Sequence, residues 1–231
     1  MSQNASPVST LLDIITSPHQ AVKNIQGNNK WMWLPLILLL GVNSAVLAYY
    51  YQIIDIDWMF DQISASSPEP LPEQARGFMT RGAMTTTSVL GVMIMIPLFM
   101  ALYAFYLNMF DKFTAKGDHG FGSWFSVSVW SSFPSIIMPL ASLIVLLTTS
   151  SDQITMDEMN FMTANALITH YPIGDPAAGF MSALSPFLFW SLWLLALNVS
   201  HKTNRSMSKS LVIAAIPYVI IYGIWGAMVL G

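Results

Sequence analysis

Few side chains in this sequence are of a type that supports catalysis. Cysteine is absent, which removes disulfides, thiolate nucleophiles and zinc–sulfur sites. His119 follows Asp118 in a glycine-rich segment, but no second histidine or carboxylate stands at metal-ligand spacing from it. The sequence lacks a Gly-x-Ser-x-Gly elbow, a His-Glu-x-x-His motif and a phosphate-binding glycine loop. We therefore predict that the protein is not an enzyme, with no catalytic residues, no metal site and no cofactor.

Polar side chains inside apolar stretches form a more informative pattern. Serines three and four positions apart share one side of a helix, as Ser128, Ser131, Ser132 and Ser135 do. Three asparagines add further amide groups, at Asn43, Asn108 and Asn198. Two interpretations stay open: these residues are a helix-packing seam, or they line the polar path of a small channel or permease.

The composition identifies the elements that carry these residues. Of 231 residues, 54% are apolar and 9% are charged, against about a quarter charged in soluble domains. About 20 apolar residues let a helix cross the roughly 30 Å hydrocarbon layer, and five uncharged windows are long enough. We predict an all-α integral membrane protein, a bundle of five transmembrane helices at about residues 34–54, 87–110, 124–147, 179–199 and 210–230. None of these spans contains a charged residue or histidine, which argues against a proton-coupled carrier.

The distribution of lysine and arginine predicts the orientation of the bundle. With the N-terminus inside, seven cations lie on the inner side and only Arg76 and Arg81 lie outside. This split follows the positive-inside rule, and the odd number of spans then places the C-terminus outside.

Residues 1–30 precede the membrane domain of residues 31–231. Ser6-Pro7 and Ser17-Pro18 each combine an N-cap residue with proline at the first helical position. Apolar residues follow each pair at helical spacing, so we predict two amphipathic helices on the cytoplasmic side. They are interpreted as interfacial helices that orient the first span, or alternatively as a docking face for a cytosolic partner.

Both outer loops are predicted to carry short helices. Ile56, Met59, Phe60 and Ile63 alternate with aspartates at helical spacing, which indicates an acidic amphipathic helix. Thr155 and Glu158 form a capping-box pattern at the start of a helix in the second loop.

A basic connector, Asn198–Lys209, joins the last two spans. Its cations stand beside uncharged runs, as in the cytoplasmic turn of a membrane hairpin. The candidates for contact with anionic lipid headgroups are His201, Lys202, Arg205 and Lys209.

Four motifs occur in order along the chain: the Ser17-to-Ile25 pattern, the segment 29–35 with two tryptophans, the stretch 125–140 with Pro134, and the region 192–217. In these motifs the sequence resembles the bacterial branch of the Yip (Ypt-interacting protein) domain family. This resemblance implies five spans, a cytosolic N-terminus and no catalytic residues. The Asp-Leu-Tyr-Gly-Pro signature of the eukaryotic branch has no match here, so binding of Rab-type GTPases is not carried over.

The predicted function is that of a non-enzymatic multi-pass membrane protein that organises lipids or binds other membrane proteins, with the channel or permease as the alternative. The partners expected are the lipid bilayer, other membrane proteins or a second copy of the chain. The net charge of −3 gives no reason to expect nucleic acid. If the protein is bacterial, its location is the cytoplasmic (inner) membrane.

Overall fold

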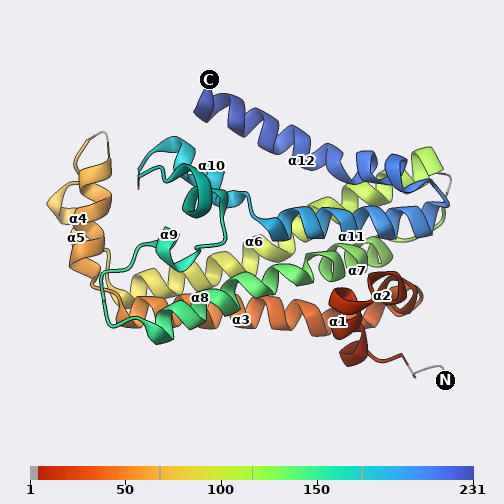
Figure 1. The fold of residues 1–231 in the computed structure, drawn as a ribbon, viewed down its shortest axis with the longest axis horizontal. Helices are drawn as coiled ribbons and strands as arrows, with labels where there is room; N and C mark the ends of the chain where they lie inside the picture. The colour runs from red at the N-terminus through yellow and green to blue at the C-terminus, as the bar shows by residue number, and fades with distance from the viewer. Residues whose placement is uncertain (1–4, 68, 116, 173) are drawn as a thin grey trace. The chain divides into compact units, whose positions relative to one another are not determined.

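The computed structural model describes residues 5–67, 69–115, 117–172 and 174–231, and every element within these ranges is helical (Figure 1). The longer helices are α3 (Trp33–Ile53), α6 (Arg81–Phe110), α7 (Phe121–Ser132), α8 (Ile137–Thr148), α11 (Pro186–Thr203) and α12 (Met207–Leu230). The shorter helices are α1 (Pro7–Thr16), α2 (Pro18–Ile25), α4 (Ile56–Ser66), α5 (Glu73–Arg76), α9 (Met156–Met159) and α10 (Pro176–Ala183). Short 3₁₀ segments are η1 (Asn29–Met32) and η3 (Phe133–Ile136), and short π-helical segments are η2 (Asp111–Ala115) and η4 (Asn165–Thr169).

Among the described residues, four helical segments are long and apolar enough to cross a membrane. They are Asn29–Ile53, Arg81–Thr114, Phe121–Thr148 and Met207–Leu230. Helices α10 and α11 are long and apolar enough to cross a membrane only when taken together, and this pair is bent by 48°. The chain therefore has four candidate spans, or five if the bent pair is one span.

The bend lies within the fourth predicted span, where the sequence led us to expect one helix. Pro186 has no N–H to donate and disfavours helical backbone in the residue before it. Ser185 is that residue. Helix α10 ends just before it, where Leu184 has an extended backbone with φ −89° and ψ 116°, and α11 begins at Pro186. The uncharged window concealed this break because hydropathy does not distinguish a proline-interrupted helix from a continuous one.

The third predicted span contains a short 3₁₀ segment at Pro134. Proline leaves the carbonyl four residues earlier, that of Trp130, without its usual donor. The N–H of Phe133 reaches that carbonyl instead. α7, η3 and α8 thereby form one continuous apolar run.

The chain divides into two compact units. Unit 1 comprises Met1–Leu40, Ile94–Ser135 and Phe187–Ile221, and unit 2 comprises Gly41–Met93, Ile136–Pro186 and Tyr222–Gly231. The buried core of unit 1 is Ala104, Leu107, Trp124, Val127, Leu195, Ala196, Val199, Ile213 and Ala214. The buried core of unit 2 is Val46, Tyr50, Tyr51, Ile54, Met59, Leu146, Ile154 and Met159.

Helices α6 and α12 expose large apolar side chains. On α6 these include Leu90, Ile94, Leu98, Phe99, Leu102 and Phe105, and on α12 Val212, Val219, Ile220, Ile221, Ile224 and Met228. Contiguous apolar surface of this extent is unusual where water is the solvent. It is the surface expected of helices that contact lipid.

Candidate functional site

The predicted serine and asparagine residues are distributed over both units, and the structure joins two of them. In unit 1, the Nδ2 of Asn198 lies 3.4 Å from the Oγ of Ser131 and donates to the Leu194 carbonyl at 2.9 Å. Ser128 and Asn108 are also buried in unit 1. Asn43 lies half-buried in unit 2.

The remaining two serines turn back to their own segment. Ser132 Oγ donates to the Ser128 carbonyl at 2.9 Å, and Ser135 Oγ donates to the Ser132 carbonyl at 2.7 Å. In such a bond the serine hydroxyl is paired with a carbonyl of its own helix. The hydroxyls of Ser132 and Ser135 are therefore paired within their own segment.

A buried carboxylate, which the sequence did not single out, lies at the turn between α6 and α7. Asp111 Oδ2 lies 3.2 Å from the backbone N–H of His119, 3.1 Å from His119 Nδ1 and 3.4 Å from Trp124 Nε1. Its other oxygen, Oδ1, is buried without a hydrogen-bond partner among the described residues. Burying a carboxylate is costly unless donors or cations compensate it, so these contacts fix the turn.

Gly117 lies directly against this carboxylate. Its N–H donates to the Asp111 carbonyl at 3.0 Å. A Cβ at position 117 would lie 2.1 Å from Asp111 Oδ1, which no side chain can accept. The glycine is therefore required here by close approach.

Two of the four predicted headgroup contacts point toward this same turn. Lys202 Nζ donates to Ser123 Oγ at 2.6 Å and lies 5.5 Å from the centre of the Trp124 ring. Arg205 donates from Nη2 to the Thr114 carbonyl at 3.3 Å and stands 5.2 Å over the Phe110 ring. Their charged groups are occupied by contacts within unit 1.

The other two predicted headgroup contacts are placed differently. The ring of His201 faces His19 of α2, with the ring centroids 6.2 Å apart. Lys209 is exposed near the start of α12.

A tyrosine of α6 compensates a proline in α12, and a second tyrosine donates to the next carbonyl of the same helix. Pro217 cannot donate to the Ile213 carbonyl, and the hydroxyl of Tyr106 does so at 2.8 Å. Tyr103 donates to the Ala214 carbonyl at 2.5 Å. A carbonyl released by a proline in a membrane helix needs a partner of this kind, so Tyr106 stabilises the proline-containing turn.

Helices α1 and α2 pack against each other in unit 1 (Figure 1). Ser6 caps α1 with a capping box, whereas Ser17 makes no side-chain cap to α2. Thr10 and Ile14 are buried, and Asn24 of α2 donates to Asp13 Oδ2 at 3.1 Å. Along the opposite side of α1, three apolar side chains form what we call the α1 stripe: Val8, Leu12 and Ile15, exposed by 63%, 65% and 43%.

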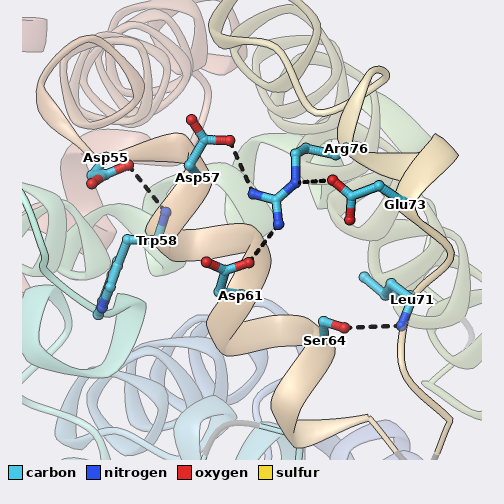
Figure 2. Close-up of polar contacts among 8 residues, drawn as sticks. All are labelled: Asp55, Asp57, Trp58, Asp61, Ser64, Leu71, Glu73 and Arg76. Atoms are coloured by element: carbon cyan, nitrogen blue, oxygen red, sulfur yellow. Dashed lines mark hydrogen bonds and ion pairs between the residues drawn. The ribbon is translucent and has the colours of Figure 1, made fainter.

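Unit 2 carries a second polar cluster, on α4 and α5. Figure 2 shows Arg76 between three carboxylates: it contacts Asp57 at 3.0 Å, Asp61 at 2.6 Å and Glu73 at 2.7 Å. The guanidinium also lies 4.2 Å from the centre of the Phe60 ring. The hydrogen bonds to Asp61, Asp57 and Glu73 raise the pKa of Arg76 above its ordinary value.

The ends of the first loop of unit 2 are fixed by backbone contacts. Asp55 caps α4 by accepting from the Trp58 N–H at 3.0 Å, and Ser64 accepts from the Leu71 N–H at 3.0 Å (Figure 2). Arg81 donates to the carbonyls of Tyr51 and Gln52 at the end of α3. A cation at a helix C-terminus satisfies carbonyls that have no partner within the helix.

The second loop of unit 2 begins with the predicted capping box. Thr155 and Glu158 form it at α9, but this helix ends at Met159 and does not continue along the apolar side of the loop. Asn165 then links two parts of the loop, because its Nδ2 donates to Asp157 at 2.8 Å and to the Tyr171 carbonyl at 3.2 Å. Ser182 of α10 donates to the other oxygen of Asp157 at 2.8 Å.

No group of three or more His, Asp or Glu side chains among the described residues is placed to hold a metal ion. The residues that sequence reasoning missed are Asp111 and His19. Asp111 had a recognisable signal, since it directly follows a long uncharged window and precedes two glycines at 117 and 120.

Comparison with known proteins gives one match. Residues 12–228 match the Yip1 domain family. No curated protein and no solved structure matches the chain.

Proposed function

Since the chain belongs to the Yip1 domain family, a family of multi-pass membrane proteins, we propose that it is a non-enzymatic protein that organises membrane lipids through its N-terminal helices. We also propose that the transmembrane helices bind other membrane proteins. We infer that the chain belongs to the bacterial branch of the family and lies in the inner membrane.

The observation that carries this proposal is the exposed α1 stripe. Val8, Leu12 and Ile15 are spaced by four and three residues, so they lie on one side of α1. The opposite side of α1 is buried, which leaves the stripe as the face available to lipid. Ten residues of helix extend only about 15 Å, half the thickness of the hydrocarbon layer. A helix of this length and pattern lies along a membrane surface.

The start of the first span supports the same placement. Trp33 is exposed and Trp31 half-exposed at the junction of η1 and α3. Tryptophan is enriched at the depth of the lipid headgroups. Lys23 and Lys30 are exposed nearby in the sequence, where cations favour a cytoplasmic, anionic leaflet. We infer that the N-terminus is inside and the C-terminus outside.

The two arginines that this topology places outside have local partners. Arg76 is surrounded by carboxylates and Arg81 binds the carbonyl end of α3. Both guanidinium groups therefore form polar contacts within unit 2. Two outer cations of this kind are compatible with the inferred orientation.

A channel or permease is the second candidate, and one observation favours it. Ser126 Oγ, Asn108 Oδ1 and Asn198 Oδ1 are buried in unit 1 without hydrogen-bond partners among the described residues. Water in a polar path would satisfy them. The contact between Asn198 and Ser131 instead favours a packed seam.

Labelling of single cysteines tests both candidates, because the natural chain contains no cysteine. Leu12→Cys, Ser131→Cys and Gln20→Cys are made in the full chain, which is reconstituted in vesicles. A fluorophore at position 12 is expected to be quenched by lipids that carry a quencher in their acyl chains, and one at exposed position 20 is not.

The cysteine at position 131 is expected to resist a charged, water-soluble thiol reagent, while the cysteine at position 20 reacts with it. Equal quenching at positions 12 and 20 would contradict the interfacial assignment of α1. Rapid labelling at position 131 would favour the hydrated path over the packed seam.

A further inference from the structure

Three basic side chains of unit 1 converge from two helices. His19 and Lys23 lie one turn apart on α2, and therefore on the same side of it. His201, on the last turn of α11, has its ring centroid 6.2 Å from that of His19. Lys23 lies close enough to His201 for the two charges to interact. We call these three residues the basic cluster.

The basic cluster is open to its surroundings. His19 and Lys23 are exposed and His201 is half-buried, whereas Ala21, Val22 and Ile25 turn the other side of α2 into unit 1. The ring of Trp193 meets that of His19 edge-on, with the centroids 6.3 Å apart. An aromatic ring and exposed basic groups thus share one surface.

No carboxylate among the described residues of the neighbouring elements compensates these charges. The single acid of α1, Asp13, accepts a hydrogen bond from Asn24. α7 has no charged residue, η1 contributes only Lys30, and the other cation of α11, Lys202, donates to Ser123. Like charges held together disfavour one another's charged form, and a bound anion would relieve this repulsion.

We propose that His19, Lys23 and His201 bind the phosphate of an anionic lipid headgroup. The proposal rests on the proposed function, since it requires α1 and α2 to lie at the membrane surface. The α1 stripe belongs to the same helical hairpin and is suited to acyl chains, while the basic cluster is suited to the phosphate above them. Phosphatidylcholine carries a compensating cation, so the site should prefer a lipid with net negative charge.

The test compares spin-labelled phosphatidylglycerol with spin-labelled phosphatidylcholine around the full chain in phosphatidylcholine vesicles, by electron paramagnetic resonance. Phosphatidylglycerol keeps its charge between about pH 6 and about pH 8, whereas lowering the pH over this range favours the charged form of a histidine. The wild-type chain is expected to prefer phosphatidylglycerol, and to do so more strongly at the lower pH.

Variants assign this preference to residues. Lys23→Gln should lower it about fivefold, the effect expected for one cation near a membrane surface. Combining His19→Gln with His201→Gln should remove the increase at low pH. Lys112→Gln is the matched control, because it removes one exposed charge from another part of unit 1 and should leave both properties intact.

The proposal is overturned if Lys23→Gln and Lys112→Gln behave alike, or if the double histidine variant keeps the pH dependence. Displacement of the labelled lipid by millimolar inorganic phosphate would reassign the site to a soluble anion. A fluorophore at Leu12→Cys in the same vesicles separates the two proposals. Lipid depth at position 12 without any preference for phosphatidylglycerol rejects the headgroup site alone, and aqueous exposure at position 12 rejects the proposed function.

Discussion

The two units use aspartate in opposite surroundings. In unit 1 the side chain of Asp111 is 1% exposed, and its nearest partners lie 3.1 to 3.4 Å away. In unit 2 the side chains of Asp57 and Asp61 are 78% and 64% exposed, yet they contact Arg76 at 3.0 and 2.6 Å. The shorter contacts thus belong to the more exposed carboxylates.

This difference shows that distance is a poor guide to the strength of a charged contact. Water solvates Asp57 and Asp61 whether or not Arg76 is present, so forming the pairs changes little. Asp111 is buried, so water does not replace a lost partner. Removing Asp111 would likewise leave the donors of His119 and Trp124 unpaired. We therefore expect the turn of unit 1 to depend on its long contacts more than the α4–α5 segment depends on its short ones.

Removing the buried carboxylate tests this comparison most strongly. Asp111→Ala leaves the side chains of His119 and Trp124 without their partner and Lys202 without a nearby negative charge. The free energy of unfolding should fall by about 2 kcal/mol, because buried donors lose their acceptor. It is measured by titration of detergent-solubilised protein with sodium dodecyl sulfate, followed by circular dichroism.

Gly117→Ala provides the control. In the wild-type chain the added methyl group would collide with Asp111 Oδ1 and destabilise the turn. In the Asp111→Ala chain this oxygen is gone, so the same methyl group should add little further loss. Equal losses in both backgrounds would show that position 117 is sensitive for a reason other than Asp111.

An uncharged buried contact should give an intermediate effect. Tyr106→Phe removes the hydroxyl that donates to the Ile213 carbonyl, and the expected loss is about 1 kcal/mol, as for other hydrogen bonds between membrane helices. Pro217→Ala supplies the backbone N–H that this carbonyl lacks. The cost of Tyr106→Phe should therefore disappear in the Pro217→Ala chain, measured by the same titration. A cost that persists there would mean that the hydroxyl acts other than through Ile213.

The helices could be predicted because apolar composition alone determines them. Four of the predicted spans lie, to within one residue, inside helical segments of sufficient length, and these segments begin three to six residues earlier than predicted. The fourth predicted span is two helices because of Pro186, a local feature that a hydropathy window averages away. The end of α9 at Met159 was also not predictable, because a capping box marks where a helix starts without setting its length.

The candidate residues were less predictable, because their contacts join distant parts of the chain. Helical spacing identified Ser131 as a residue on a polar side of its helix, but it gave no pairing with Asn198, 67 residues later. His201 was recognised only as part of a basic connector, and its neighbour His19 lies on a helix near the other end of the sequence. Asp111 was not recognised from the sequence at all, although the turn buries it.

The exposed cluster of unit 2 should give the smallest effect. Arg76→Gln removes three ion pairs, but water and salt solvate the carboxylates that remain. The fall in the free energy of unfolding should be smaller than that for Tyr106→Phe and should vanish in about 1 M salt. Arg81→Gln is the matched control: it exposes no carboxylates but removes the donor to two carbonyls at the end of α3, so its effect should persist in salt. If Arg76→Gln destabilised the protein as much as Asp111→Ala and salt did not reduce the loss, exposure would not be what separates the two units.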